Sequence, residues 1–275
     1  SVVLNYYKTN FMVKYSIAIA GMLSLLSACK PPQKSASSLD FDPYHYTVNK
    51  KLEAENGAVV SAHPLASKAG VSILKSGGNA VDAAIATQLA LAVVYPNAGN
   101  LGGGGFMVAR LSNGETVSLD YREMAPGSAH RDMYLDAAGN ADLDKSQLGH
   151  LSSGVPGTVA GLFASHKYAK LPFEKLIQPA IVLAEKGFII SASEARSLNS
   201  LQTDLKKYNS VMPVFVKTAP WKAGDTLVQK DLASTLRRIQ KNGAAGFYEG
   251  ETAKLIVAEM KRGKGIISLD DLKNY

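Results

Sequence analysis

The sequence predicts a protein of the α+β class, in which helices pack against antiparallel strands. Apolar and amphipathic segments of helical length follow one another from residue 64 onward. Two alternating segments, 106–110 and 115–121, flank the turn Ser112-Asn113-Gly114 and predict a β-hairpin. The 275 residues are 46% hydrophobic and 19% charged, a composition typical of globular proteins with a sizeable core.

The first 46 residues are expected to lie outside this fold. A short basic start precedes the apolar run 16–27, which is too short for a comfortable membrane span. The run ends in Leu26-Ser27-Ala28-Cys29, the pattern at which bacterial lipoproteins are cleaved and lipidated on the cysteine. Residues 1–28 are therefore interpreted as upstream residues and a lipoprotein signal peptide, and residues 29–46 as a tether rich in Pro and Ser.

This interpretation predicts a location in the bacterial cell envelope, on the periplasmic or the outer surface. The lipid on Cys29 would anchor the protein to the membrane. The sequence has one cysteine, so no internal disulfide is expected. The alternative is an ordinary buried cysteine within an N-terminal helix.

The remaining region, residues 47–275, is predicted to begin with three elements. The apolar run 58–62 is predicted as a short buried strand. Pro64 begins a predicted helix that extends to about Lys75. The next helix, 80–94, is apolar nearly all round and is expected to be buried. Asp82 within it must have a partner, because an unpaired buried carboxylate is costly, and we favour a structural role for it.

Further helices are predicted after the hairpin from their capping residues and from the glycines that follow them. The expected segments are 158–168 after a Thr158 cap, 174–186 before Gly187, a helix from Ser191 or Ser193, 231–242 after an Asp231 cap, and 252–262. A capping box at Ser268–Asp271 opens one more helix. Only about one turn follows before Tyr275, and we expect the chain to be cut within a structural element.

Several common chemistries are not indicated. The formal charge is +7, but the positive residues are scattered, so nucleic-acid binding is not expected. The glycine run Gly102–Gly105 follows a helix and precedes a strand, which is not the setting of a phosphate-binding loop. The alternatives are close backbone packing or a surface of backbone N–H groups near a site. The histidines and the single cysteine form no metal-ligand pattern, and no cofactor is expected. Ser72 and Lys75 match the SxxK motif of penicillin-binding proteins, but its companion motifs are missing.

Arg122 is the candidate binding residue. It follows the predicted strand 115–121 and precedes the break at Pro126-Gly127. Strand ends beside loops are favoured positions for binding residues. A planar guanidinium there is suited to bind a carboxylate through two parallel hydrogen bonds. The alternative is a surface ion pair with Asp120 or Glu123.

Four motifs, in this order, closely resemble the γ-glutamyltransferase family: GGNAVDAAIAT (Gly77–Thr87), GNLGGGGFMV (Gly99–Val108), DYREMAP (Asp120–Pro126) and SSGVPGTVAG (Ser152–Gly161). The resemblance extends from about Asn56 to Tyr275 and includes GDTLVQKDLASTL, FYEG and GIISLDDLKNY. Enzymes of this family cleave glutathione and other γ-glutamyl compounds and transfer the glutamyl group to water or to an amino acceptor. The resemblance implies an N-terminal-nucleophile hydrolase fold, an αββα sandwich that is incomplete in this chain.

The resemblance also implies roles for individual residues. Arg122 matches the family's arginine that binds the α-carboxylate of the glutamyl group. The family's precursor cleaves itself into a large and a small subunit, and the new N-terminal threonine of the small subunit is the nucleophile. That threonine is expected beyond Tyr275, so no catalytic residue is assigned here and the 275 residues alone are expected to be inactive. The expected partners are a γ-glutamyl substrate such as glutathione, the small subunit and the membrane.

Three alternatives remain open. A cephalosporin or glutaryl acylase shares the fold, and its substrate also presents a carboxylate to Arg122. A truncated, non-catalytic lipoprotein could keep the glutamyl-binding arginine without the nucleophile. A penicillin-binding role for Ser72 is the most remote.

Overall fold

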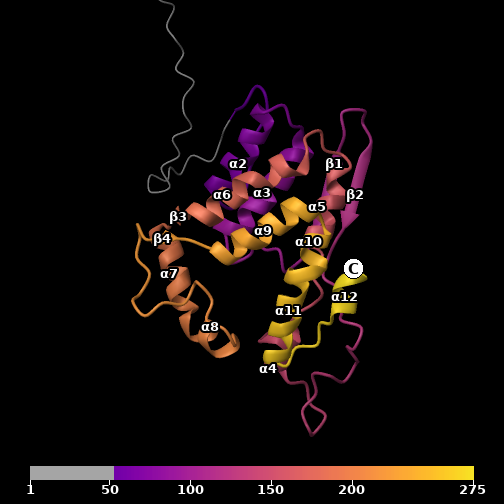
Figure 1. The fold of residues 1–275 in the computed structure, drawn as a ribbon, viewed down its shortest axis with the longest axis vertical. Helices are drawn as coiled ribbons and strands as arrows, with labels where there is room; N and C mark the ends of the chain where they lie inside the picture. The colour runs from indigo at the N-terminus through magenta and orange to yellow at the C-terminus, as the bar shows by residue number, and fades with distance from the viewer. Residues whose placement is uncertain (1–52) are drawn as a thin grey trace, which may run out of the picture. The chain divides into compact units, whose positions relative to one another are not determined.

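A computed structural model describes residues 53–275 (Figure 1). The bounds of its α-helices are α2 Pro64–Lys75, α3 Ala80–Val94, α4 Leu143–Gln147, α5 Thr158–His166, α6 Phe173–Lys186, α7 Ala192–Ser200, α8 Gln202–Tyr208, α9 Lys230–Asn242, α10 Ala245–Tyr248, α11 Gly250–Arg262 and α12 Leu269–Lys273. A 3-10 helix, η1, covers His150–Ser152. Four strands form two antiparallel pairs: β1 Phe106–Arg110 with β2 Thr116–Asp120, and β3 Phe188–Ile189 with β4 Thr226–Leu227.

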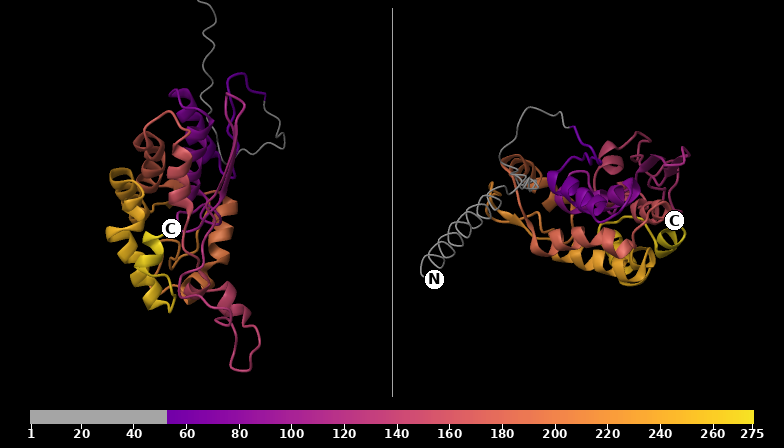
Figure 2. Two further views of the ribbon diagram at one scale, coloured as in Figure 1. Left: turned by 90° about the vertical axis from the view of Figure 1, so that its right-hand side faces the viewer. Right: turned by 90° about the horizontal axis from the view of Figure 1, so that it is seen from above.

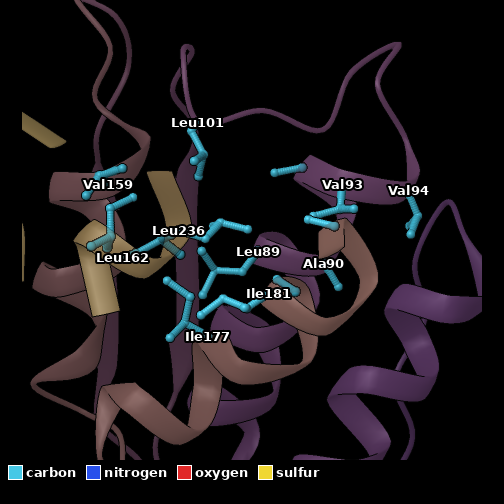
Figure 3. Close-up of a cluster of buried hydrophobic side chains, with 14 of the residues drawn as sticks. Leu89, Ala90, Val93, Val94, Leu101, Val159, Leu162, Ile177, Ile181 and Leu236 are labelled. Atoms are coloured by element: carbon cyan, nitrogen blue, oxygen red, sulfur yellow. The ribbon is translucent and has the colours of Figure 1, made fainter. Parts of the chain in front are cut away.

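Helix α3 is the central element of the core. Asn79 caps its first turn by accepting hydrogen bonds from the N–H groups of Val81 and Asp82. The helix packs against α2 and α6, and α6 packs in turn against α9. Figure 3 shows buried side chains of α3, α5, α6 and α9 in one cluster, together with Leu101 from the segment after α3. The labelled helical residues are Leu89, Ala90, Val93, Val94, Val159, Leu162, Ile177, Ile181 and Leu236. Burying each large side chain of this set contributes about 1.5–3 kcal/mol, so the contact of the helices is mainly hydrophobic.

Helix α6 packs between its neighbours through its apolar face. Helix α6 buries Leu176, Ile177 and Ile181. It continues through Pro179 and ends at Gly187, which has a positive φ of 77°. The right-hand view of Figure 2 shows α6 between the indigo α2–α3 pair and the yellow C-terminal helices.

The hairpin β1–β2 carries the chain to Arg122. Phe106 pairs with Asp120 and Arg110 with Thr116, so the strands are in register along their whole length. Gly114 in the connecting turn has a φ of 87°, which favours glycine. Helix α5 packs against β2. The end of β2 is therefore held by both the hairpin and a core helix.

The prediction of a strand at 58–62 is wrong. These residues form no strand, and Val60 is 93% exposed. An extended segment needs a neighbouring strand to satisfy its backbone hydrogen bonds, and none of the described residues supplies one. The apolar pattern alone could not reveal this.

Each predicted helix is present, with two corrections to their caps, whereas the short helices α4, α8 and α10 were not predicted. Thr158 is the first residue of α5, and Gly157 takes the cap position. Asp231 lies in the first turn of α9, whose cap position is Gln229. The predicted capping box at Ser268 forms. Of the two predicted starts of α7, Ser191 is the cap, and it forms a capping box that was not predicted.

Cys29, the predicted signal peptide and the predicted tether lie outside the described residues. Within residues 53–275, no helix is both long enough and apolar enough to cross a membrane.

Candidate substrate-binding site around Arg122

The backbone of Arg122 is fixed on both sides. Its N–H donates to Oδ1 of Asp120 at 2.9 Å, a contact that turns the chain out of β2. Its carbonyl accepts a hydrogen bond of 2.7 Å from the hydroxyl of Tyr275, 153 residues further along the chain. The strand end therefore holds Arg122 in a defined place on the surface.

The guanidinium of Arg122 uses only one of its three nitrogen atoms in a hydrogen bond to another described residue. Its Nε donates to Oε2 of Glu123 at 3.1 Å, and its Cζ lies 5.8 Å from the centroid of the Phe106 ring. The side chain is 64% exposed. Among residues 53–275, no acceptor is hydrogen-bonded to its two Nη atoms. Of the two ion pairs considered from the sequence, the one with Glu123 is present and leaves the outer edge of the guanidinium open.

Glu123 is held in its ionised form. The backbone N–H of Glu123 itself, and then the Arg122 guanidinium, lower the pKa of its carboxyl below the usual value. The carboxylate contacts the guanidinium at Nε and leaves the Nη edge free. A ligand carboxylate that approaches the Nη edge would meet two parallel donors.

Backbone hydrogen bonds join three of the sequence motifs next to Arg122. Gly103 accepts hydrogen bonds from the N–H groups of Gly157 and Thr158 at 2.7 and 2.9 Å. Met124 and Val155 exchange two backbone hydrogen bonds in an isolated antiparallel bridge. The segments 99–108, 120–126 and 152–161 thus form one hydrogen-bonded unit.

The glycines of these motifs permit close backbone approach. A Cβ on Gly104 would lie 2.4 Å from the carbonyl oxygen of Tyr121, and one on Gly161 would lie 2.1 Å from Cγ of Tyr121. Tyr121 is 7% exposed, and burial raises the pKa of its hydroxyl. Gly104 and Gly105 are therefore closely packed against residues 121–123, whereas a Cβ on Gly102 would meet nothing within 4 Å in the described part of the chain. Close backbone packing, an alternative to a phosphate loop that the sequence left open, is present in the second half of the run.

The C-terminal segment contributes two residues whose contacts with the site were not predicted from the sequence. Tyr275 bonds to Arg122, and Oδ1 of Asp271 accepts a 2.7 Å hydrogen bond from the N–H of Gly127. Asp271 also completes the capping box of α12. Both residues lie in the matched segment GIISLDDLKNY, but no local pattern shows that this segment folds back onto residues 122–127.

The other candidates have structural roles. The carboxylate of Asp82 is fully buried and accepts hydrogen bonds from the N–H groups of Asn79, Lys170 and Leu171 at 2.7, 3.0 and 2.9 Å. Ser72 donates its hydroxyl to the Ala69 carbonyl of its own helix. The described part of the chain contains no cluster of residues that could hold a metal ion.

Comparison with known proteins identifies the family. The family model described as gamma-glutamyltranspeptidase matches residues 66–275, more than half of the chain. This chain belongs to the gamma-glutamyltranspeptidase family. The match contains Arg122, Gly157 and Tyr275, so the whole of the site described above lies within it.

The alignments with individual relatives show what share of their length this chain covers. It is 46% identical over 273 residues to the glutathione hydrolase proenzyme of Escherichia coli, covering 94% of this chain and 45% of the relative. The chain therefore spans about half the length of the curated relatives it matches.

Solved structures confirm the fold. The gamma-glutamyltranspeptidase of Helicobacter pylori has a TM-score of 0.79 and 48% identity, covering 82% of this chain and 65% of that chain. A cephalosporin acylase from Bacillus halodurans has a TM-score of 0.72 and 28% identity, covering 86% and 45%. The predicted N-terminal-nucleophile hydrolase fold, present here in part, is confirmed.

Proposed function

We propose that these residues are the large-subunit part of an enzyme that cleaves γ-glutamyl bonds. The substrates are glutathione and γ-glutamyl amides, and the glutamyl group passes to water or to the amino group of an amino acid or peptide. Family membership and the identity to glutathione hydrolase proenzymes support this proposal. The observation that carries it is the open Nη edge of Arg122 on a fixed strand end.

Arg122 binds the α-carboxylate of the glutamyl group in this proposal. The side chain of Glu123 occupies Nε, so the substrate carboxylate takes the two Nη atoms. A charge-assisted, two-pronged contact fixes both the position and the plane of the carboxylate. The γ-carbonyl of the substrate is then presented at a defined distance from the anchor.

The nucleophile comes from outside the 275 residues. A threonine hydroxyl attacks the γ-carbonyl and its proton passes to the threonine's own α-amino group. That group then gives the proton to the nitrogen of the substrate amide, and the C–N bond breaks to release the amine. Water or an amino acceptor then attacks the resulting ester and releases the glutamyl group. Within this chain, Arg122 binds and orients the substrate and does not take part in the bond changes.

The small subunit of the same precursor is the expected partner. Phe106 and Val108 lie on one face of β1 and are 61% and 84% exposed, and Val60 is also exposed. A two-stranded hairpin with an open apolar face is marginal by itself in water. These residues offer a surface on which the small subunit would add strands.

A glutaryl or cephalosporin acylase is the second candidate, favoured by the similarity to the Bacillus halodurans acylase. The two activities are separated by anilides of γ-glutamate and glutarate, which both carry the carboxylate and differ in the α-amino group. The processed protein, with both subunits, is expected to release aniline from the γ-glutamyl compound. Faster release from the glutaryl compound would establish the acylase. Glutamate binding without turnover of either would establish a non-catalytic binding protein.

The protein is further proposed to be a lipoprotein of the bacterial envelope, anchored through Cys29. The support is the apolar run that ends in Leu26-Ser27-Ala28-Cys29. Mass spectrometry of the mature N-terminus in the native host tests this directly. A diacylglyceryl group on Cys29, absent after Cys29→Ser, is the expected result; an unmodified cysteine within a longer chain would refute it.

A further inference from the structure

The hydroxyl of Tyr275 fixes the carbonyl end of Arg122. The hydrogen bond between them is 2.7 Å long and joins residues that are distant in the sequence. The N–H of Arg122 is already bound by Asp120. Without Tyr275, the carbonyl of Arg122 would lose this partner, and the next backbone contact along the chain would be the bridge between Met124 and Val155.

The ring of Tyr275 is itself held by a rigid neighbour. It stacks on the ring of Tyr248, with centroids 5.9 Å apart and planes 4° from parallel. Tyr248 donates its hydroxyl to the Pro156 carbonyl at 2.8 Å and accepts from the Ala160 N–H at 3.1 Å. This second tyrosine is 8% exposed, so its position is set by the core.

Gly157 leaves the space that the Tyr275 hydroxyl occupies. A Cβ on this glycine would lie 1.9 Å from the hydroxyl oxygen. Gly157 belongs to the unit that bonds to Gly103, so the motif 152–161 supports Arg122 indirectly, through Tyr275. The contact is thus built from three segments of the chain.

The hydroxyl keeps its proton over the physiological range. Burial, and then the nearby carboxylates of Asp120 and Glu123, raise the pKa of Tyr275 above its usual value. A protonated phenol is the required donor to a carbonyl oxygen.

We propose that Tyr275 is a positioning residue for the substrate carboxylate, acting through the main chain of Arg122. The inference rests on the proposed function of Arg122. A positioning role and a general structural role predict different results. In the positioning role, loss of the Tyr275 hydroxyl weakens the contact between the Arg122 guanidinium and the substrate carboxylate and leaves the rest of the protein unchanged.

The test is Tyr275→Phe in the complete, processed protein. The substitution keeps the ring and its stacking on Tyr248 and removes only the donor. The expected result with a γ-glutamyl anilide is a KM higher by about three- to tenfold with kcat unchanged within about twofold, because the contact is made equally in the ground and transition states. The matched control is Tyr134→Phe, which removes a hydroxyl that donates to the Leu151 carbonyl at 3.2 Å and should leave KM unchanged.

A double-mutant cycle decides whether the effect passes through Arg122. In an Arg122→Ala background, Tyr275→Phe should no longer lower kcat/KM. An equal loss in both backgrounds, an unchanged KM in the single variant, or a fall in kcat alone would overturn the inference. If Arg122→Ala itself leaves kcat/KM unchanged, the proposed function of Arg122 fails first; if it lowers kcat/KM and Tyr275→Phe does not, only the inference fails.

Discussion

Asp82 illustrates how far the chemistry of a single residue can be predicted. A carboxylate inside an apolar helix needs donors, and the structure supplies backbone N–H groups from the cap residue Asn79 and from the segment after α5. The need for a partner was predictable, but the identity of Lys170 and Leu171, 88 and 89 residues away, was not. The same holds for Arg122, whose place was predicted and whose contact with Tyr275 was not.

Asp82→Asn tests this account of the buried carboxylate. The amide keeps one acceptor oxygen but directs an NH₂ group at backbone donors, so the free energy of unfolding should fall by about 2–3 kcal/mol. Urea unfolding of the complete protein measures the change. Asp231→Asn, at an exposed position of α9, is the matched control and should cost well under 1 kcal/mol. Equal small effects of the two substitutions would refute the role of Asp82.

At the scale of elements, capping residues and following glycines predicted the bounds of the longer helices, whereas the apolar pattern at 58–62 predicted a strand that is not present. Caps and following glycines are local, so α2, α3 and α6 begin and end within about a residue of their predicted bounds. A strand depends on a partner elsewhere in the chain, and 58–62 has none among the described residues. The hairpin succeeded because its partner strand follows directly after the turn.

The glycine run offers a test of the packing between elements. Gly104→Ala places a Cβ 2.4 Å from the Tyr121 carbonyl and 2.8 Å from Cα of Arg122, so we expect a loss of about 1–3 kcal/mol and a higher KM for the γ-glutamyl substrate. Gly102→Ala, two residues earlier, meets nothing within 4 Å and should be close to neutral. Thermal unfolding and steady-state kinetics of both variants measure the difference. Indistinguishable variants would show that the backbone behind Arg122 is not closely packed.

For the molecule as a whole, polar side-chain contacts join segments that are distant in the sequence, in addition to the packing of the apolar core. His150 of η1 lies 2.8 Å from Oε1 of Glu259 in α11, and Arg262 binds the other carboxylate oxygen. The contact of Gly127 with Asp271 brings α12 to the segment after Arg122. The pairs His150–Glu259 and Gly127–Asp271 have no sequence signature, since each joins residues more than 100 positions apart. The pair Glu259–Arg262 has the i,i+3 spacing of a helix and is the local one.

The contact of Glu259 predicts a pH dependence of stability. Burial would raise the pKa of its carboxyl, but hydrogen bonds from His150, Arg262 and Ser210 outweigh burial and lower the pKa from 4.5 to about 2. Because the folded pKa is the lower one, the stabilisation is fully present above about pH 4.5 and is lost as the pH falls toward 2.

Glu259→Gln should therefore lower the free energy of unfolding at pH 7 by about 1 kcal/mol, and the gap to the parent protein should narrow at acid pH. Urea unfolding of the complete protein between pH 2.5 and pH 7 follows both. Glu251→Gln, exposed near the start of the same helix, is the control. A constant gap across this range would contradict the assignment.

The central claim is that Arg122 binds the α-carboxylate of a γ-glutamyl substrate, and it is tested most directly by changing both partners. The enzyme is varied by Arg122→Lys and the substrate by comparing the γ-glutamyl anilide with the 4-aminobutyryl anilide, which lacks only the α-carboxylate. We predict that Arg122→Lys lowers kcat/KM for the γ-glutamyl anilide by about ten- to a hundredfold, mainly through KM, because one ammonium cannot replace two parallel donors. The same substitution should leave the 4-aminobutyryl anilide unaffected. An unchanged KM for the γ-glutamyl anilide, or an equal loss with both substrates, would contradict the claim.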